Sequence, residues 1–285
     1  MKTMPLNPDL HCHSTVSDGW LAPAEVVARA AANGVDLLAL TDHDETGGLA
    51  AAAAAARTQG LAFVPGVEVS VSWAEETVHI VGLGIDAANP VLDAGLRQVR
   101  SGRDERARRM SDALAERGIH GVLEGALKYA RNPALVSRAH FARYLVEIGC
   151  APSAGEVFRH YLVRGKPGFV ETQWARLDEA VGWIRAAGGV PVVAHPGRYR
   201  LSDAQMEALL AAFVDAGGQG VEVVSGSHSA TKVGKFARYA RRYGLLASRA
   251  SDFHGVEESA VDLGRCDPLP AGLTPVWERL TDYMI

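Results

Sequence analysis

Short apolar runs alternate with helix-like stretches along most of the chain, and this alternation limits the folds that the chain can adopt. Residues 36–43 (DLLALTDH) and 190–196 (VPVVAHP) have the composition of buried strands in parallel sheets. Similar runs occupy residues 61–73, 77–85, 220–226 and 245–254, after a brief first run that ends at Leu10. These roughly seven runs, with helices between most of them, predict a parallel α/β sheet that closes into a barrel.

The helices expected between the runs carry ordinary start and stop signals. The stretch from Pro23 to about Asn33 has proline in its first turn and Gly34 after its end. The Ala-rich stretch at 49–57 is explained by the high helix propensity of alanine. Further helices are expected from residue 90 towards 117 and at 180–187, 203–216 and 231–244.

Residues 101–171 break this alternation, because they are helical in pattern, rich in arginine and without a convincing strand. We expect them to form a small helical insertion domain, a lid over the barrel mouth, with the barrel built from residues 1–100 and 172–285. The arginine-rich stretch at 97–110 also contains Asp and Glu. That mixture predicts an exposed helix with internal ion pairs rather than a path for an RNA strand.

Size and charge narrow the class of protein. With 285 residues, of which 48% are hydrophobic, the chain is long enough for one large domain with an insertion. Its formal net charge of −4 gives no overall attraction to nucleic acid or to a membrane. An anionic substrate must therefore be held by a local cationic site, such as bound metal or a few Arg and Lys side chains.

The cysteines and the start of the chain indicate a reducing compartment. Cys12, Cys150 and Cys266 are widely spaced and odd in number, so they predict no disulfide framework. The first fourteen residues hold no apolar stretch of signal-peptide length, and no run approaches the ~20 apolar residues that span a bilayer. We expect a cytoplasmic protein with no membrane segment and no obligate protein partner.

Histidines and acids gather at the ends of the predicted strands. In parallel α/β barrels, catalytic groups lie at the carboxyl ends of the strands, so these side chains are expected to share one rim. The side chains in question are His11, His13, Asp42, His43, Glu68, His195, Asp252 and His254, with His79 inside its run. His120 and His160 lie off this pattern and are expected at the surface.

The spacing of these residues suits metal binding. Residues two apart on a strand point to the same side, so His11 and His13 can act together, as can Asp252 and His254. Imidazole and carboxylate suit Zn, Fe or Mn, and a carboxylate such as Glu68 can bridge two ions. Two ions about 3.5–4 Å apart can activate water and stabilise displacement at phosphorus. Taken alone, His79 reads as a core histidine; taken with the others, it favours a metal ligand.

Several motifs, in this order, resemble those of the polymerase and histidinol phosphatase (PHP) family: DLHCHSTVSDG, LLALTDHDETGG, PGVEVS, HIVGLG, AHPGRY and SDFH. The resemblance covers nearly the whole chain. It implies a distorted seven-stranded (β/α) barrel and a centre of two or three divalent metal ions, often Mn²⁺, with Fe²⁺ or Zn²⁺ as alternatives.

The resemblance also assigns ligands. One metal would be held by His11, His13, Glu68 and Asp252, a second by Asp18, His43 and His254, and a third by Glu68, His79 and His195. Many family members carry a histidine where this chain has Asp18.

Motifs in the second half of the chain resemble a narrower subgroup. RNPALVSRAHFARYLVE, VFRHYLVRGKPGFV, QWARLDEAVGWI and VEVVSGSHS resemble enzymes that convert nucleoside 3′,5′-bisphosphates to nucleoside 5′-monophosphates. The same subgroup includes enzymes that trim short 5′-phosphorylated RNA from its 5′ end. A histidinol-phosphate phosphatase and a non-catalytic PHP module are two further readings, ranked below these.

Candidate substrate contacts lie in the lid and in the loops that follow strands. A hydroxyl, a cation and backbone amides at a helix start can grip phosphate. The candidates are Ser137, Arg138, His140, Lys166, Arg198, Ser225 and His228. Trp174 and Trp183 are expected to pack between layers, with stacking on a base as the alternative.

These observations predict metal-assisted hydrolysis of a phosphate monoester. The expected substrate is a small nucleotide such as adenosine 3′,5′-bisphosphate, whose 5′-phosphate the cationic lid would hold. Short RNA is the alternative substrate. Catalytic roles beside the metals, such as protonation of the leaving oxygen, fall to His195, His254 and Asp252.

Overall fold

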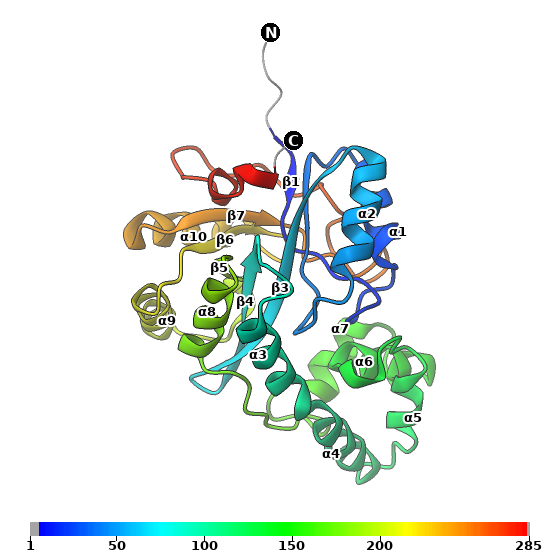
Figure 1. Cartoon of the computed structure of the whole chain (residues 1–285). Coiled ribbons are helices and arrows are strands. Elements are labelled where there is room, and N and C mark those ends of the chain that lie inside the picture. Colours follow the sequence, from blue (N-terminus) through cyan, green and yellow to red (C-terminus); the bar gives the residue numbers. More distant parts are fainter. Residues whose placement is uncertain (1–5, 284–285) are drawn as a thin grey trace.

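The computed structural model describes residues 6–283 and contains one sheet of seven strands in the order β1-β2-β3-β4-β5-β6-β7 (Figure 1). The strands are β1 Pro8–Asp9, β2 Leu37–Leu40, β3 Ala62–Trp73, β4 Glu76–Leu83, β5 Val190–Val193, β6 Gly220–Ser225 and β7 Leu246–Ala250. The backbone N–H of Leu10 donates to the carbonyl of Arg249 at 3.2 Å, next to a bridge between Cys12 and Phe253. The first and last strands therefore meet, and the sheet forms the expected nearly closed seven-stranded barrel.

The strands are not all parallel, which corrects the prediction of a wholly parallel sheet. The β3–β4 and β4–β5 pairs are antiparallel, and the remaining neighbours run parallel. Ala74 and Glu75 both have positive φ and form a tight turn that folds β4 directly back on β3. A run of apolar residues carries no information about strand direction, so the reversal was not visible in the run itself.

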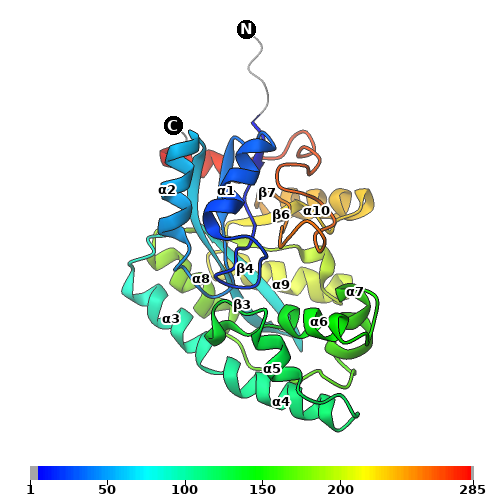
Figure 2. The same cartoon turned by 90° about the vertical axis from the view of Figure 1, so that its right-hand side faces the viewer.

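Helices cover the outside of the barrel, and Figures 1 and 2 show α1 and α2 packed together on one flank. Gly95 of α3 lies against Trp183 of α8, where a Cβ would stand 2.3 Å from the indole Cδ2. Trp183 thus packs between layers, as expected. The outer helices are α1 Pro23–Ala32, α2 Leu49–Gln59, α3 Pro90–Ser101, α8 Leu177–Ala186, α9 Asp203–Asp215 and α10 Ala230–Tyr243.

The interior of the barrel is apolar at one end and polar at the other. One end is filled by a cluster of buried apolar side chains that includes Leu37, Val64 and Val192, and Val276 and Leu280 of the C-terminal segment pack into it. Farther along the same strands, the inward positions of β3 and β4 carry Glu68 and His79. The apolar end thus supports a polar end, where the candidate site lies.

Helices α4–α7 have a hydrophobic cluster of their own, which includes Met110, Phe141 and Leu162. They lie at the end of the molecule opposite the C-terminal turns (Figures 1 and 2). The predicted helix from residue 90 towards 117 is two helices, because α3 ends at Ser101 and α4 starts after Gly102. The elements of this segment are α4 Arg103–Ala115, α5 Val122–Leu127, a 3₁₀ turn Pro133–Leu135, α6 Arg138–Glu147, α7 Ala154–Val157 and a π-helical turn Phe158–Leu162.

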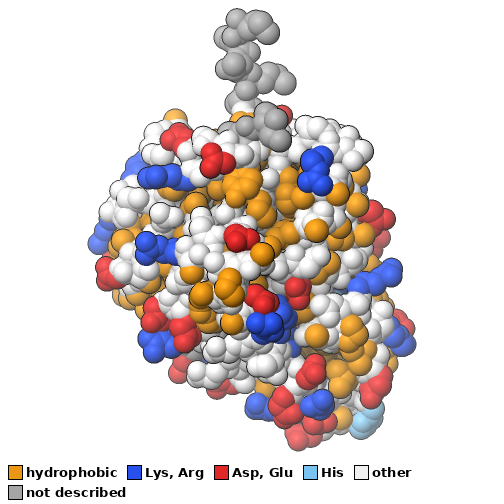
Figure 3. Space-filling model, viewed as in Figure 1, with side chains coloured by type: hydrophobic (Ala, Val, Ile, Leu, Met, Phe, Trp, Pro, Cys, Tyr) orange, Lys and Arg blue, Asp and Glu red, His pale blue; other side chains and the backbone are white. Residues whose placement is uncertain are grey.

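Basic and acidic side chains are interspersed on the face drawn in Figure 3. That mixture agrees with the net charge of −4 and shows no broad basic stripe on that face. In the described part of the chain, the helices are all too short or too polar to cross a membrane.

Candidate metal centre

Glu68 lies at the middle of a cluster of histidines. Its Oε2 stands 3.3 Å from Nε2 of both His11 and His13 and 2.8 Å from Nδ1 of His43. Its Oε1 lies 2.8 Å from Nδ1 of His79. Oε1 also lies 3.0 Å from Nε2 of His195. One fully buried carboxylate on β3 thus contacts five histidines, which come from four separate segments of the chain.

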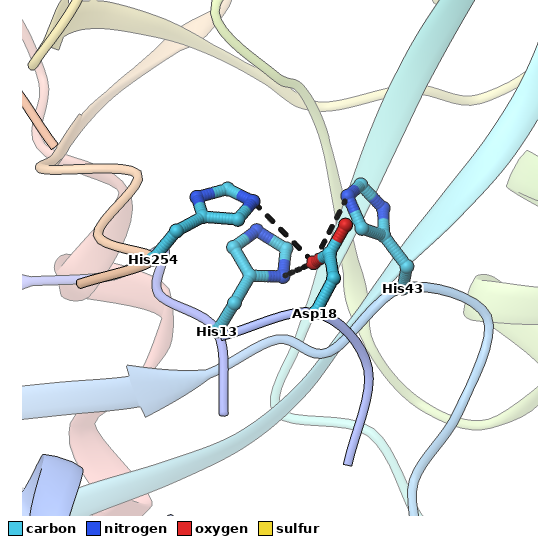
Figure 4. Close-up of side chains that lie close together, drawn as sticks. All are labelled: His13, Asp18, His43 and His254. Atoms are coloured by element: carbon cyan, nitrogen blue, oxygen red, sulfur yellow. Dashed lines mark ion pairs between the residues drawn. The ribbon is translucent and has the colours of Figure 1, made fainter. Parts of the chain in front are cut away.

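Asp18 forms a second focus together with three of the histidines (Figure 4). Its Oδ1 lies 3.5 Å from Nε2 of His254, 3.9 Å from Nε2 of His43 and 4.0 Å from Nδ1 of His13. Asp18 sits in the loop after β1, and a Cβ on Gly19 would stand 2.4 Å from the carbonyl oxygen of His13. The glycine therefore lets this loop turn tightly enough to bring Asp18 back to the histidines.

Asp252 closes the cluster from the loop after β7. Its Oδ1 lies 3.4 Å from Nε2 of His13 and 3.6 Å from Nε2 of His11. Asp252 and His195 have φ values of 56° and 26°, in the region that glycine favours. Strained backbone of this kind is concentrated at functional sites.

Several buried carboxylate oxygens of this cluster have no hydrogen-bond donor among the described residues. Among residues 6–283, Oδ1 of Asp18, Oε2 of Glu68 and Oδ1 of Asp252 are buried and accept no hydrogen bond. Burying a carboxylate without compensation is costly, whereas bound divalent cations would supply the charge that these oxygens lack. Groups whose ligand atoms lie within 4.8 Å of one another are His13–Asp18–His43–His254, His11–His195–Asp252, His11–His13–Glu68 and His43–Glu68–His79. The donor set therefore fits divalent metals that bind nitrogen and oxygen.

The histidines differ in how their surroundings affect protonation. Burial opposes the charged form of His43, but Glu68 and Asp18 outweigh it and raise its pKa to about 9. Burial lowers the pKa of His13 to about 3 and that of His79 to about 4. With no cation present, the carboxylates thus keep a proton on part of the cluster, and a metal would take over this neutralising charge.

A layer of carboxylates behind the cluster orients the ligands. Glu222 of β6 accepts a 2.6 Å hydrogen bond from Nδ1 of His11 and another of 2.6 Å from the backbone N–H of His195. Donation from Nδ1 leaves Nε2 of His11 free to face Glu68 and Asp252. Asp42 accepts hydrogen bonds from both hydroxyls of Ser14 and Ser17, at 2.6 Å each. Asp42 therefore shapes the loop that carries Asp18. The role of Glu222 was not predicted, because it depends on contacts with residues far away in the sequence.

A cavity of about 390 Å³ opens over the centre, within the ~300–1,000 Å³ typical of small-molecule sites. The predicted contacts Ser137, Arg138 and Arg198 line it, together with His43, His79, His195, Asp252 and His254. Arg198 forms an ion pair with Asp252. Side chains from the helical segment and from the barrel thus enclose one space.

The arginine-rich stretch is only partly an exposed helix, which corrects its prediction. Arg103 and Arg106 are buried, at 4% and 8% exposure, and both line the cavity with Trp174. The sequence signal that was missed is helical spacing, because Arg103, Arg106 and Met110 share the buried face of α4.

Four predicted contacts do not line the cavity. His140 is buried, and its Nδ1 accepts a 3.0 Å hydrogen bond from the backbone N–H of Ser137, as part of the cap of α6. Lys166 lies in an exposed turn, and Ser225 is buried at the end of β6. His228 has both ring nitrogens engaged by backbone, with Nδ1 3.0 Å from the carbonyl of Val223 and Nε2 accepting from Gly197 at 3.0 Å.

Arg143 of α6 fastens the helical segment to the barrel. It makes two 2.8 Å hydrogen bonds to the carboxylate of Glu258, which follows β7. It also donates to the backbone carbonyl of Asp18 and stacks over Trp20, 4.4 Å from the ring centroid. The helical segment is thus attached directly to two loops that carry candidate ligands.

Comparison with known proteins agrees with this geometry. The chain is 55% identical to a 3′,5′-nucleoside bisphosphate phosphatase from Chromobacterium violaceum over 96% of each chain. It is 43% identical to the 5′-3′ exoribonuclease Rnm of Escherichia coli, over 95% of this chain and 92% of that one. A solved structure of an amidohydrolase from C. violaceum, with bound sulfate and no metal, superposes with a TM-score of 0.95 at 55% identity, covering 97% of this chain and 96% of that one.

The model of the PHP domain family matches residues 9–190, which hold six of the nine candidate ligands. The order of motifs, the seven-stranded barrel and the extent of these similarities agree with one another. This chain belongs to the PHP domain family.

Proposed function

We propose that this chain is a metal-dependent phosphoesterase that removes the 3′-phosphate from nucleoside 3′,5′-bisphosphates and leaves nucleoside 5′-monophosphates. One observation carries the proposal: six of the nine candidate metal ligands line the same cavity as the buried arginines Arg103 and Arg106. The cluster suits chemistry at one phosphate, and the arginines suit recognition of a second anionic group. The 55% identity to a 3′,5′-nucleoside bisphosphate phosphatase supports the same substrate.

The proposed centre holds two or three divalent ions, with Mn²⁺ as the first candidate and Fe²⁺ or Zn²⁺ as alternatives. Their ligands would come from every side of the cluster. They are His11, His13, Asp18, His43, Glu68, His79, His195, Asp252 and His254. Bound ions would make a water molecule nucleophilic at neutral pH and neutralise charge on the phosphoryl oxygens. Glu68 lies where it can bridge ions, and Glu222 holds His11 in the tautomer that presents Nε2.

Hydrolysis forms a bond from the water oxygen to phosphorus and breaks the bond from phosphorus to the 3′ oxygen, which takes up a proton. His195 and His254 line the cavity and are the proposed donors of that proton where they are not engaged by metal. Asp252 is the proposed partner that holds Arg198 against the reacting phosphate. Residues 101–171 are the proposed lid, since Ser137 and Arg138 of this segment line the cavity.

A second candidate function is 5′-3′ removal of nucleotides from short RNA. A further cavity of about 300 Å³ adjoins the first and shares Thr77, Arg106 and Trp174 with it. That space offers room for the next nucleotide of a chain, and the 43% identity to Rnm supports this activity. The same ligands would serve both reactions. We place the protein in the cytoplasm, supported by its three free cysteines.

The test compares two substrates in separate assays. Phosphate release from adenosine 3′,5′-bisphosphate is measured with Mn²⁺, beside degradation of a 5′-phosphorylated RNA trimer. Formation of AMP at a higher kcat/KM than trimer cleavage supports the phosphatase, and the reverse order supports the exoribonuclease. His43→Ala and Asp252→Ala, checked for folding by circular dichroism, are expected to lose at least about a hundredfold in rate. Full activity in both variants would refute the assignment of the site.

A further inference from the structure

The hydroxyl of Tyr199 lies between the backbones of strands β4 and β5. It accepts a 2.9 Å hydrogen bond from the backbone N–H of His79 and donates a 2.7 Å hydrogen bond to the carbonyl of Ala194. A tyrosine hydroxyl can be acceptor and donor at the same time. The two backbones are therefore joined through a side-chain oxygen at this point of the sheet.

The register of the strands shows which bond this hydroxyl replaces. Ile80 pairs with Val193 in antiparallel register. The residues next in line, His79 and Ala194, face each other, and the N–H of Ala194 donates directly to the carbonyl of His79 at 3.0 Å. An antiparallel pair bonded in this way normally exchanges two direct hydrogen bonds. Here the second bond is replaced by the bridge through Tyr199, so the hydroxyl is inserted into the ladder and holds the two backbones apart.

Both backbones carry a candidate metal ligand at this opening. His79 belongs to β4, and His195 directly follows Ala194. Nδ1 of His79 and Nε2 of His195 lie 2.8 and 3.0 Å from the same oxygen of Glu68, Oε1. The centroids of the two imidazole rings are 5.3 Å apart. The separation of the backbones at this point thus sets the separation of two imidazoles around one carboxylate oxygen.

Tyr199 also contacts His195 directly. Its ring lies edge-on to the imidazole, with the centroids 5.6 Å apart and an angle of 68° between the ring planes. The 3₁₀ turn Pro196–Arg198 joins the two residues, and the positive φ of 26° at His195 bends the backbone where this turn begins. One side chain therefore touches the backbone of one candidate ligand and the ring of another.

We propose that Tyr199 is a positioning residue that spaces His79 and His195 for joint binding of a cation. The inference rests on the proposed function for the cation, whereas the spacing is a property of the sheet itself. Of the described residues, those that line the cavity do not include Tyr199, so it acts through the two histidines and not on substrate. Without the hydroxyl, a direct bond would bring N of His79 and O of Ala194 to about 2.9 Å. Such a change matters because metal–nitrogen bonds have a narrow range of lengths.

The first experiment measures metal binding without catalysis. Mn²⁺ is titrated into metal-free wild type, Tyr199→Phe and Tyr243→Phe, and the free ion is followed by electron paramagnetic resonance. Tyr243 donates to the carbonyl of Glu207 at 3.3 Å between the outer helices, so its variant loses a similar hydroxyl away from the centre. We expect one ion to bind about ten- to a hundredfold more weakly to Tyr199→Phe, and Tyr243→Phe to bind like the wild type. Equal binding by all three proteins would overturn the role of Tyr199.

A double-mutant cycle separates positioning from a general effect on the fold. The double variant His79→Ala/His195→Ala lacks both imidazoles that Tyr199 is proposed to space, while the ions held by the other candidate ligands remain measurable. Adding Tyr199→Phe to this variant should change the affinity for those ions by less than about twofold, because a residue that acts through two ligands has no effect without them. A loss as large as in the wild-type background would contradict the proposal.

The second experiment tests the spacing without metal. In a crystal structure of metal-free Tyr199→Phe, we expect the N–H of His79 to bond directly to the carbonyl of Ala194 and the imidazoles of His79 and His195 to shift relative to Glu68. Unmoved imidazoles, whether or not water replaces the hydroxyl, would refute the proposal. If the wild type binds no Mn²⁺, Fe²⁺ or Zn²⁺, the proposed function fails, while this structure still decides whether Tyr199 spaces the two histidines.

Discussion

The hydroxyl of Ser137 donates a 2.9 Å hydrogen bond to Oδ2 of Asp18, and so links the N-cap of α6 to a carboxylate of the candidate metal centre. The same hydroxyl accepts a hydrogen bond from the backbone N–H of Ala139 at 3.1 Å. The start of the helical segment and the position of Asp18 are therefore coupled through one oxygen atom. Since the other carboxylate oxygen of Asp18 faces three histidines, this contact fixes the direction in which Asp18 presents it.

Replacing this hydroxyl should weaken metal binding. In Ser137→Ala, Asp18 loses a partner and α6 loses its cap, which costs about 1 kcal/mol of stability. We expect about ten times more Mn²⁺ to be needed for half-maximal activity. Ser153→Ala, which removes the N-cap of α7, is the matched control and should leave the Mn²⁺ requirement unchanged. An unchanged requirement in Ser137→Ala would show that the contact with Asp18 is incidental.

Glu222 should matter for metal affinity although it is not among the candidate ligands. Glu222→Gln keeps the size of the side chain but replaces one acceptor with an amide, so it cannot accept from both His11 and His195 as the carboxylate does. Outer partners of this kind typically contribute ten- to about a hundredfold to metal affinity or activity. Isothermal titration with Mn²⁺ measures the change, and wild-type affinity in Glu222→Gln would contradict the role described for it.

The buried imidazole of His140 should make stability depend on pH. Burial lowers the pKa of His140 to about 4, against about 6.5 in the unfolded chain. Between these values the unfolded chain binds a proton that the folded chain does not, so stability falls as the pH is lowered from 6.5 to 4. His140→Gln retains an acceptor for the N–H of Ser137 in a capping-box arrangement and removes the titration.

Urea unfolding at pH 7.5 and pH 5 tests this expectation. The loss of stability between the two pH values should be about 1–2 kcal/mol smaller in His140→Gln than in the wild type. The exposed His120 supplies a control, because His120→Gln should leave the difference unchanged. The same pH dependence in His140→Gln and in the wild type would contradict a buried, neutral His140.

The pair formed by Arg143 and Glu258 should stabilise the contact between helical segment and barrel. Arg143→Met leaves Glu258 unpaired and removes the donor to the carbonyl of Asp18. A double-mutant cycle with Glu258→Gln is expected to give a coupling energy of about 1–3 kcal/mol. Limited proteolysis of residues 103–162 should also be faster in Arg143→Met. A coupling energy near zero would mean that other contacts hold the helical segment.

Much of the fold was predictable because strand and helix periods are local properties of the sequence. The seven strands agree with the predicted runs, with β4 starting one residue earlier than its run, and the expected family and barrel are confirmed. The reversal of β4 was not predictable from its run, because direction is decided by the turn at Ala74 and Glu75. The break at Gly102 was missed for a related reason, since the charged pattern continues unbroken on both sides of it.

Part of the candidate site could also be predicted from the sequence, and part could not. Most of its histidines and acids were predicted because strand ends converge in a barrel, and Asp18 was predicted from the family resemblance. The structure brings all nine predicted ligands together. Glu222, Arg103 and Arg106 were missed, because their roles depend on contacts between residues far apart in sequence. Trp174, expected to pack between layers, is half-buried and lines the cavity beside two arginines. His228, a predicted substrate contact, accepts a hydrogen bond from the backbone N–H of Gly197.

The left-handed backbone at His195 and Asp252 also has an evolutionary meaning. At either position glycine would relax the main chain, so drift under selection for stability alone would tend to place glycine there. A bulky imidazole and a buried carboxylate occupy these positions instead, against that tendency. These two positions thus preserve a trace of selection in which the usefulness of the side chains outweighed the strain of the main chain that carries them.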